Sequence, residues 1–214
     1  MILPFTGDAV QATIPKVVAH LRSGGLIGYP TETVYGLGGN VSDEGVQGVA
    51  RLKGREPGKP FLLIIADVKM AEDLGLLFNG SARALARACW PGPLTLALPG
   101  GPRLSPMLRG PEGGVAVRYT GHKDLARLVA ALGAPITSTS ANRPGNPPAP
   151  GAERLVEEFK PEVESGQLLV LDGGVLGRVP PSTLVDCTQS EPRLVREGAI
   201  PRDELRRLVG RFAP

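Results

Sequence analysis

The sequence contains few of the residues that bind metals or form disulfides. Its 214 residues include two cysteines and two histidines. Cys89 and Cys187 lie far apart in the chain, and no histidine or second cysteine stands at the spacing of a zinc-ligand pair. This scarcity argues against a structural zinc site and against a disulfide framework. We therefore expect no metal site built by the protein.

Long apolar runs are also missing. No stretch approaches the roughly 18 consecutive apolar residues that a membrane-spanning helix requires. The first residues, MILPFTGDAVQATIP, lack the basic region and the apolar stretch of a signal peptide. We expect a soluble cytoplasmic protein with no membrane partner.

Aromatic residues and excess charge, the two usual marks of a nucleic-acid-binding surface, are both scarce. The chain has one Trp, three Tyr and five Phe, and its net charge is +3 from 24 basic and 21 acidic residues. A platform for stacked bases needs more aromatic side chains, and a small positive charge attracts phosphates only weakly. We expect at most weak direct binding to RNA.

Common nucleotide and hydrolase signatures are absent as well. The sequence has no G-x-x-x-x-G-K-[ST] loop, and GLGGNV lacks the third glycine of a G-x-G-x-x-G fingerprint. No G-x-S-x-G motif occurs either. A phosphate site in this chain must therefore be built from other residues.

The sequence does contain an alternation of helix-like and strand-like segments. Apolar residues recur at helical spacing in some segments, and short apolar runs separate these segments. We predict helices over residues 13–23, 43–54, 81–89, 122–133, 152–159 and 202–210, a further helix after Asp67, and N-caps at Asp43 and Asp67. We predict strands over residues 25–30, 61–66, 94–98, 115–119, 135–139, 168–172, 182–187 and 193–197. This alternation indicates an α/β fold.

The proline-rich stretch from Ala141 to Glu153 is either an interdomain linker or a long surface loop. The three short strands and two helices predicted after it form a poor independent core. We therefore predict a single domain over residues 1–214, with this stretch as a surface loop and no extra C-terminal domain.

Three polar clusters are candidates for chemistry. PTETVYGLG at residues 30–38 has more polar residues and glycines than a turn needs. KGREPGKP at residues 53–60 gathers three cations, which either bind a polyphosphate or only complement the dipole of the preceding helix. TSTSAN at residues 137–142 follows a predicted strand, where it forms either a ligand site or a polar turn.

Taken in order, these fragments resemble one family. GLIGYPTETVYGLG, KGREPGKP, WPGPLTLAL, GVAVRY, STSAN, PSTLVD and RLVREGAI are similar to segments of the YrdC-type threonylcarbamoyl-AMP synthases of tRNA modification. The resemblance covers nearly the whole chain. It implies a twisted mixed β-sheet flanked by helices, with the catalytic site in a cationic concavity of this YrdC-like fold.

The resemblance also implies roles for individual residues. The threonine pocket would be formed by Thr31, Arg118, Ser138 and Ser182. Arg118 would pair with the carboxylate of the substrate. ATP would be held by the K-x-R pair, the S-x-N pair and one further arginine: Lys53, Arg55, Ser140, Asn142 and Arg196. Lys53 and Arg55 would also be catalytic, because they would stabilise charge on the reacting phosphates.

Enzymes of this type combine L-threonine, bicarbonate or CO2, and ATP into threonylcarbamoyl-adenylate and pyrophosphate. The resemblance therefore implies these three substrates and Mg2+ bound mainly through the ATP phosphates. It also implies hand-off of the product to a tRNA threonylcarbamoyl transferase complex, which modifies the adenosine beside the anticodon.

Two alternatives belong to other classes. One is an inactive paralogue that acts as an RNA-binding or ribosome-associated module. The other is a carbamoyl-transfer domain of the hydrogenase maturation type, although those domains occur in much longer chains with zinc modules. The presence of both the K-x-R and the S-x-N pair favours the synthase.

Overall fold

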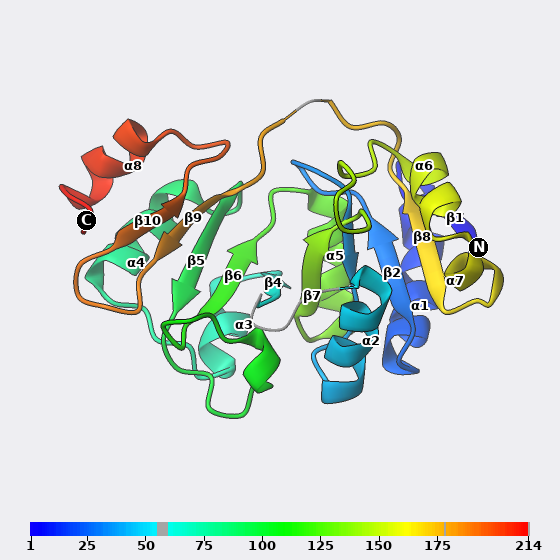
Figure 1. Ribbon diagram of the computed structural model, residues 1–214, viewed down its shortest axis with the longest axis horizontal. Coiled ribbons are helices and arrows are strands. Elements are labelled where there is room, and N and C mark those ends of the chain that lie inside the picture. Colours follow the sequence, from blue (N-terminus) through cyan, green and yellow to red (C-terminus); the bar gives the residue numbers. More distant parts are fainter. Residues whose placement is uncertain (55–59, 178, 214) are drawn as a thin grey trace.

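The computed structural model describes residues 1–54, 60–177 and 179–213, and its central feature is a ten-stranded mixed sheet (Figure 1). The strands are β1 (Ile2–Pro4), β2 (Leu26–Tyr29), β3 (Gly36–Gly38), β4 (Leu62–Ile65), β5 (Leu94–Leu98), β6 (Val115–Tyr119), β7 (Ile136–Ser140), β8 (Leu168–Asp172), β9 (Thr183–Asp186) and β10 (Arg193–Arg196). Their order across the sheet is β1-β8-β2-β3-β7-β4-β6-β5-β9-β10.

Helices flank this sheet on both faces. They are α1 (Ala9–Arg22), α2 (Asp43–Lys53), α3 (Val68–Asp73), α4 (Gly80–Cys89), α5 (Lys123–Leu132), α6 (Ala152–Glu158), α7 (Lys160–Glu164) and α8 (Arg202–Val209), with a 3-10 turn at Pro106–Leu108. The sheet contains parallel pairs such as β4 with β6 and antiparallel pairs such as β5 with β6. The predicted α/β fold with a twisted mixed sheet and flanking helices is confirmed.

The core has one apolar layer on each face of the sheet. Helices α1 and α5 contact each other and cover one layer, in which Leu21 and Leu128 are fully buried. Residues of α2, α4, α6 and α8 contribute to the other layer, for example Val49 and Leu85. Because each helix buries a single stripe of apolar residues, the periodicity in the sequence was sufficient to locate most of them.

Several element boundaries differ from the predictions. The N-cap of α2 is Ser42 and not Asp43, since the Ser42 hydroxyl accepts a hydrogen bond from the Gly45 amide at 3.1 Å. Asp67 caps α3 as predicted, accepting from the Met70 amide at 2.7 Å. Helix α1 begins four residues before the predicted start and contains Pro15 in its interior. Strands β1 and β3 and helix α7 were not predicted.

The proline-rich stretch connects β7 to α6, and the chain beyond it returns to the same sheet. Strand β8 pairs in parallel with both β1 and β2, and β9 pairs in parallel with β5. Figure 1 shows β8 and β9 on opposite sides of the view. None of the helices within the described ranges is long and apolar enough to cross a membrane.

Candidate active site

A cavity of about 390 Å³ lies over the middle of the sheet, where side chains from several strands and from the loop before β3 converge. This volume is within the range of roughly 300–1,000 Å³ that is typical of small-molecule sites. Of the eight predicted site residues that the structure describes, six line it: Thr31, Arg118, Ser138, Ser140, Ser182 and Arg196. The fold therefore brings together residues from five separate sequence motifs.

Arg118 is the most enclosed cation of the cavity, with 3% of its surface exposed. Its Nη1 donates to the Thr33 hydroxyl at 3.2 Å, and its Nε donates to the Gly92 carbonyl at 3.3 Å. Its Nη2 lies 2.7 Å from a Glu32 oxygen, but the N–H directions do not point at that oxygen. Within the described residues Nη2 therefore has an ion-pair partner and no well-directed hydrogen bond, which favours an acceptor supplied by a ligand.

Glu32 was not among the predicted site residues, although it lies inside the PTET motif. Its carboxylate pairs with Arg118 and accepts hydrogen bonds from the Thr120 hydroxyl at 2.8 Å and the Gly121 amide at 2.7 Å. Burial alone would raise the pKa of Glu32, but the charge of Arg118 and the hydrogen bond from Gly121 outweigh burial, and the net pKa is lowered. Glu32 therefore stays ionised and fixes Arg118.

The polar loop before β3 is shaped by the hydroxyl of Thr31. This oxygen accepts hydrogen bonds from the amides of Thr33 at 3.0 Å and Val34 at 3.2 Å, and it donates to the Val34 carbonyl at 2.7 Å. The Tyr35 hydroxyl donates to the Gly174 carbonyl at 2.8 Å, which ties the loop to the segment after β8. The polar residues of PTETVYGLG thus form a closed turn at the edge of the cavity.

Glycine is required in β3 by the close approach of its neighbour β7. A Cβ at Gly38 would collide with the carbonyl oxygen of Thr137. The backbone of Gly36 pairs with Ser140, so this tight packing sets the distance between the PTETVYGLG loop and the Ser140 end of β7. The glycines are therefore explained by strand packing beside the cavity.

Lys53, at the end of α2, is buried and does not line the cavity. Its exposed fraction is 7%, and its ammonium donates to the Ser140 carbonyl at 2.9 Å and the Ser140 hydroxyl at 3.3 Å. The same ammonium also contacts the Asn142 carbonyl at 2.5 Å and side-chain oxygen at 2.6 Å. Lys53 therefore fixes the predicted S-x-N pair against α2. The Asn142 amide nitrogen is itself engaged, donating to the carbonyls of Arg143 at 3.0 Å and Asn146 at 2.7 Å.

Arg196 and Ser182 form the opposite wall of the cavity. Arg196 Nη2 donates to the Ser182 carbonyl at 2.9 Å, and the Ser182 hydroxyl lies 2.8 Å from the Thr95 hydroxyl. Burial and, to a lesser degree, the nearby charge of Arg118 lower the pKa of Arg196. Two guanidinium groups thus share one cavity, and no carboxylate is among the described residues that line it. This electrostatic arrangement favours an anionic ligand.

No metal-binding cluster occurs in the parts of the chain that the structure describes, since no three His, Cys, Asp or Glu residues come together there. The carboxylate beside the cavity, that of Glu32, is already paired with Arg118. The described side chains near the cavity therefore do not form a site that could hold a metal ion through protein ligands alone. Arg55, the remaining predicted residue, lies outside the described residues.

Comparison with protein families gives one match that covers most of the chain. Residues 19–198 match the model for Sua5, YciO and YrdC, which is described as "Telomere recombination". A protein of Thiobacillus denitrificans called threonylcarbamoyl-AMP synthase is 38% identical over 182 residues, covering 85% of this chain and 94% of that protein. A protein of the same name from Pyrococcus abyssi is 36% identical over 191 residues, covering 89% of this chain and 55% of the relative. The chain thus spans about half of some relatives and nearly all of others.

Two solved structures are similar over most of the chain. Sua5 of P. abyssi in complex with L-threonine has a TM-score of 0.90 at 31% identity, covering 99% of this chain and 62% of Sua5. YciO of E. coli has a TM-score of 0.78 at 26% identity, covering 92% of this chain and 94% of YciO.

Proposed function

The chain belongs to the Sua5/YciO/YrdC family, and on that basis we propose that it is a threonylcarbamoyl-AMP synthase acting in the cytoplasm. It joins L-threonine, bicarbonate or CO2, and ATP, and it releases pyrophosphate. One observation carries the proposal, namely the two arginines, Arg118 and Arg196, that share one cavity with several hydroxyl groups. Both threonine and ATP present anions to such a site. The name of the relatives and the L-threonine complex of Sua5 support the choice of substrates.

Threonine binds in this proposal at the Arg118 end of the cavity. Its carboxylate accepts from Arg118 Nη2, the group that lacks a well-directed hydrogen bond. Ser138 and Ser182 line the same cavity and supply hydroxyl groups for the rest of the substrate. Thr31 contributes by holding the turn beside them, because its own hydroxyl is already used within the loop.

ATP binds between Arg196 and the segment held by Lys53. Ser140 lines the cavity, and the Lys53 ammonium holds both Ser140 and Asn142 in position. Arg55, two residues after Lys53 in the sequence, completes this site in the proposal. Mg2+ would enter with ATP and would be held mainly through the phosphates, since no cluster of carboxylates occurs among the described residues.

The reaction needs positioning and charge stabilisation. The neutral amine of threonine adds to the carbon of CO2 and loses a proton to water, which gives a carbamate. A carbamate oxygen then attacks the α-phosphorus of ATP. The bond from that phosphorus to the β-phosphate oxygen breaks, and pyrophosphate leaves with the electron pair. Arg118 holds the threonine end in place, while Lys53, Arg55 and Arg196 offset the negative charge of the phosphates.

The product is a reactive mixed anhydride, and we propose that it passes to a tRNA threonylcarbamoyl transferase complex. Bare tRNA should bind this chain only weakly and in a salt-sensitive way, because the net charge is +3. Tight tRNA binding at physiological salt would favour an RNA-binding module instead.

The direct test is to mix the protein with L-threonine, bicarbonate and MgATP and to look for the adenylate by mass spectrometry. Pyrophosphate should appear in equal amount, and it should require both threonine and bicarbonate. Consumption of ATP that persists when either is omitted would contradict the synthase proposal.

A further inference from the structure

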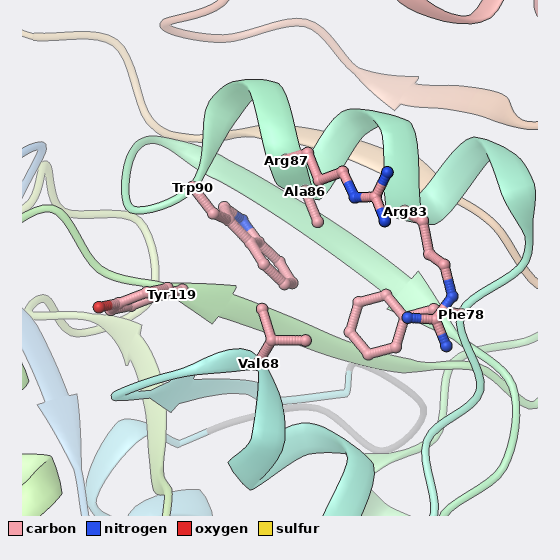
Figure 2. Close-up of a pocket in the computed structure, with 7 residues that line it drawn as sticks. All are labelled: Val68, Phe78, Arg83, Ala86, Arg87, Trp90 and Tyr119. Atoms are coloured by element: carbon pink, nitrogen blue, oxygen red, sulfur yellow. The ribbon is translucent and has the colours of Figure 1, made fainter.

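A second pocket lies on the opposite face of β6 from the cavity. Neighbouring residues of a strand point to opposite faces, so Tyr119 faces away from the cavity that Arg118 lines. The pocket has a volume of about 270 Å³ and opens beside α4 (Figure 2). Its lining residues are Val68, Phe78, Arg83, Ala86, Arg87, Trp90 and Tyr119.

The walls of this pocket are aromatic and held in place. The Trp90 indole N–H donates to the Leu94 carbonyl at 2.7 Å, so its polar group is satisfied inside the protein. Phe78 packs edge-on against Trp90, with ring centres 6.0 Å apart and an angle of 86° between the rings. Figure 2 shows the two rings next to each other in the wall of the pocket, with Val68 below the indole. The pocket therefore presents preformed apolar surface.

The rim of the pocket is positively charged. Arg83 and Arg87 lie one turn apart on α4, and Figure 2 shows both side chains reaching over the pocket. Arg83 stacks on Phe78 and pairs with Glu72 at 3.3 Å, but both charged side chains are about half exposed. Arg87 makes no ion pair or side-chain hydrogen bond with any residue in the described ranges. The rim therefore retains positive charge that an incoming acid could meet.

Size and composition point to a protein as the occupant. The volume is below the roughly 300–1,000 Å³ of typical small-molecule sites, and it suits one bulky side chain. Trp, Tyr, Phe and Arg are the residue types enriched where protein partners bind, and anchor side chains commonly fill such pockets. The positive rim selects acidic residues beside the anchor.

We propose that this pocket is a docking site for a partner protein. The partner inserts one large apolar side chain into the pocket, where it contacts Trp90, Phe78 and Val68. Asp or Glu residues beside that side chain pair with Arg83 and Arg87. Such a surface would leave the cavity on the other face of β6 open to substrates while the partner is bound.

A selection of random peptides displayed on phage provides the test. The peptides are selected on the immobilised protein and, in parallel, on the Arg83→Glu, Arg87→Glu double variant. We expect enrichment on the parent protein of peptides that carry one aromatic or large aliphatic residue flanked by Asp or Glu. The enriched peptides should lose at least about tenfold in affinity when that apolar residue is changed to Ala.

The protein contains one tryptophan, so intrinsic fluorescence reports this pocket directly. Titration of an enriched peptide should change the Trp90 emission, and the single variant Arg87→Glu should bind at least about tenfold more weakly than the parent. Arg127→Glu on α5, whose arginine side chain is 70% exposed, is the matched control and should bind normally. All variants should keep the circular dichroism spectrum of the parent.

Three outcomes would overturn the proposal. They are the absence of any enrichment relative to the double variant, enrichment of basic peptides, and competition of the enriched peptides with ATP. The last would place the peptides in the cavity. Since binding is measured without substrates, failure of this test leaves the proposed synthase activity unaffected.

Discussion

Arg118 and Arg87 are both arginines, but one is buried and the other is exposed. They lie on opposite faces of the sheet around β6. Arg118 is 3% exposed and is held by Glu32, Thr33 and Gly92. Arg87 is exposed on α4 and has no charged partner among the described residues. A buried arginine with fixed neighbours is positioned before its ligand arrives, whereas an exposed one is ordered only by a partner. The two sites are therefore suited to different tasks, catalysis and docking.

The largest effect should come from Arg118→Ala. A hydrogen bond to a charged group contributes about 1.5–3 kcal/mol, and the change also leaves Glu32 without its counterion. The efficiency of pyrophosphate release with threonine should fall at least about 100-fold. Arg87→Ala, the matched change on the other face, should leave this rate within about twofold. A similar loss in both variants would remove the distinction between the two arginines.

Lys53→Met should reduce turnover by about tenfold or more and should also destabilise the fold. The methionine keeps most of the volume but cannot donate to the oxygens of Ser140 and Asn142. We expect a loss of about 1–3 kcal/mol in the free energy of unfolding, measured in urea. Lys16→Met, at an exposed position of α1, is the control and should change stability by less than about 0.5 kcal/mol. An unchanged stability in Lys53→Met would show that the contacts of Lys53 are dispensable.

Glu32→Gln should make stability less dependent on pH. The pKa of Glu32 is lowered from its ordinary value of 4.5, so the stabilising effect of its charge is present above that value and is lost as the pH falls through the folded pKa. The parent should be about 1–3 kcal/mol more stable than the variant at pH 7. That difference should shrink below about pH 4.5, and urea unfolding at pH 7 and pH 3.5 measures it. A difference that grows in acid would contradict the assigned direction.

The smallest effect should come from the exposed pair Arg83–Glu72. Ion pairs between exposed side chains typically contribute about 0.2–1 kcal/mol and are screened by salt. A double-mutant cycle with Arg83→Ala and Glu72→Ala should give a coupling in that range, smaller in 0.5 M NaCl. The same cycle on Arg118 and Glu32 should give a larger coupling that salt changes little, because that pair is shielded from solvent.

Most of the fold was accessible from the sequence because its elements bury regular apolar patterns. The strands at residues 94–98, 115–119 and 168–172 were predicted with their observed bounds. Strand β3 was missed because Gly-Leu-Gly has a single apolar side chain and no alternation to detect. Strand β1 was missed because it is a three-residue edge strand that ends in a proline. Strand β1 pairs with the distant β8, and β3 pairs with the distant β7 as well as with its neighbour β2. Local patterns do not encode such long-range pairing.

The site was predictable as a set of residues but not as a network. The motifs pointed to Arg118, Ser138, Ser140, Ser182 and Arg196, and these do line one cavity. The ion pair of Glu32 joins residues from the loop before β3 and from β6, which no local spacing relates. One signal for this ion pair was available in the sequence. A buried arginine such as Arg118 requires a counterion, and Glu32 is the acidic residue of the polar motif PTETVYGLG.

The position of β8 between β1 and β2 has a consequence for synthesis of the chain. Ile2 pairs with Val170, and Ile27 pairs with Leu169, so these N-terminal strands are parallel neighbours of a strand made much later. Until β8 has left the ribosome, one edge of β2 has no partner, and exposed strand edges invite pairing with other chains. Contacts of such long sequence separation also slow folding. The nascent protein therefore depends on its last third to complete the sheet that its first residues begin.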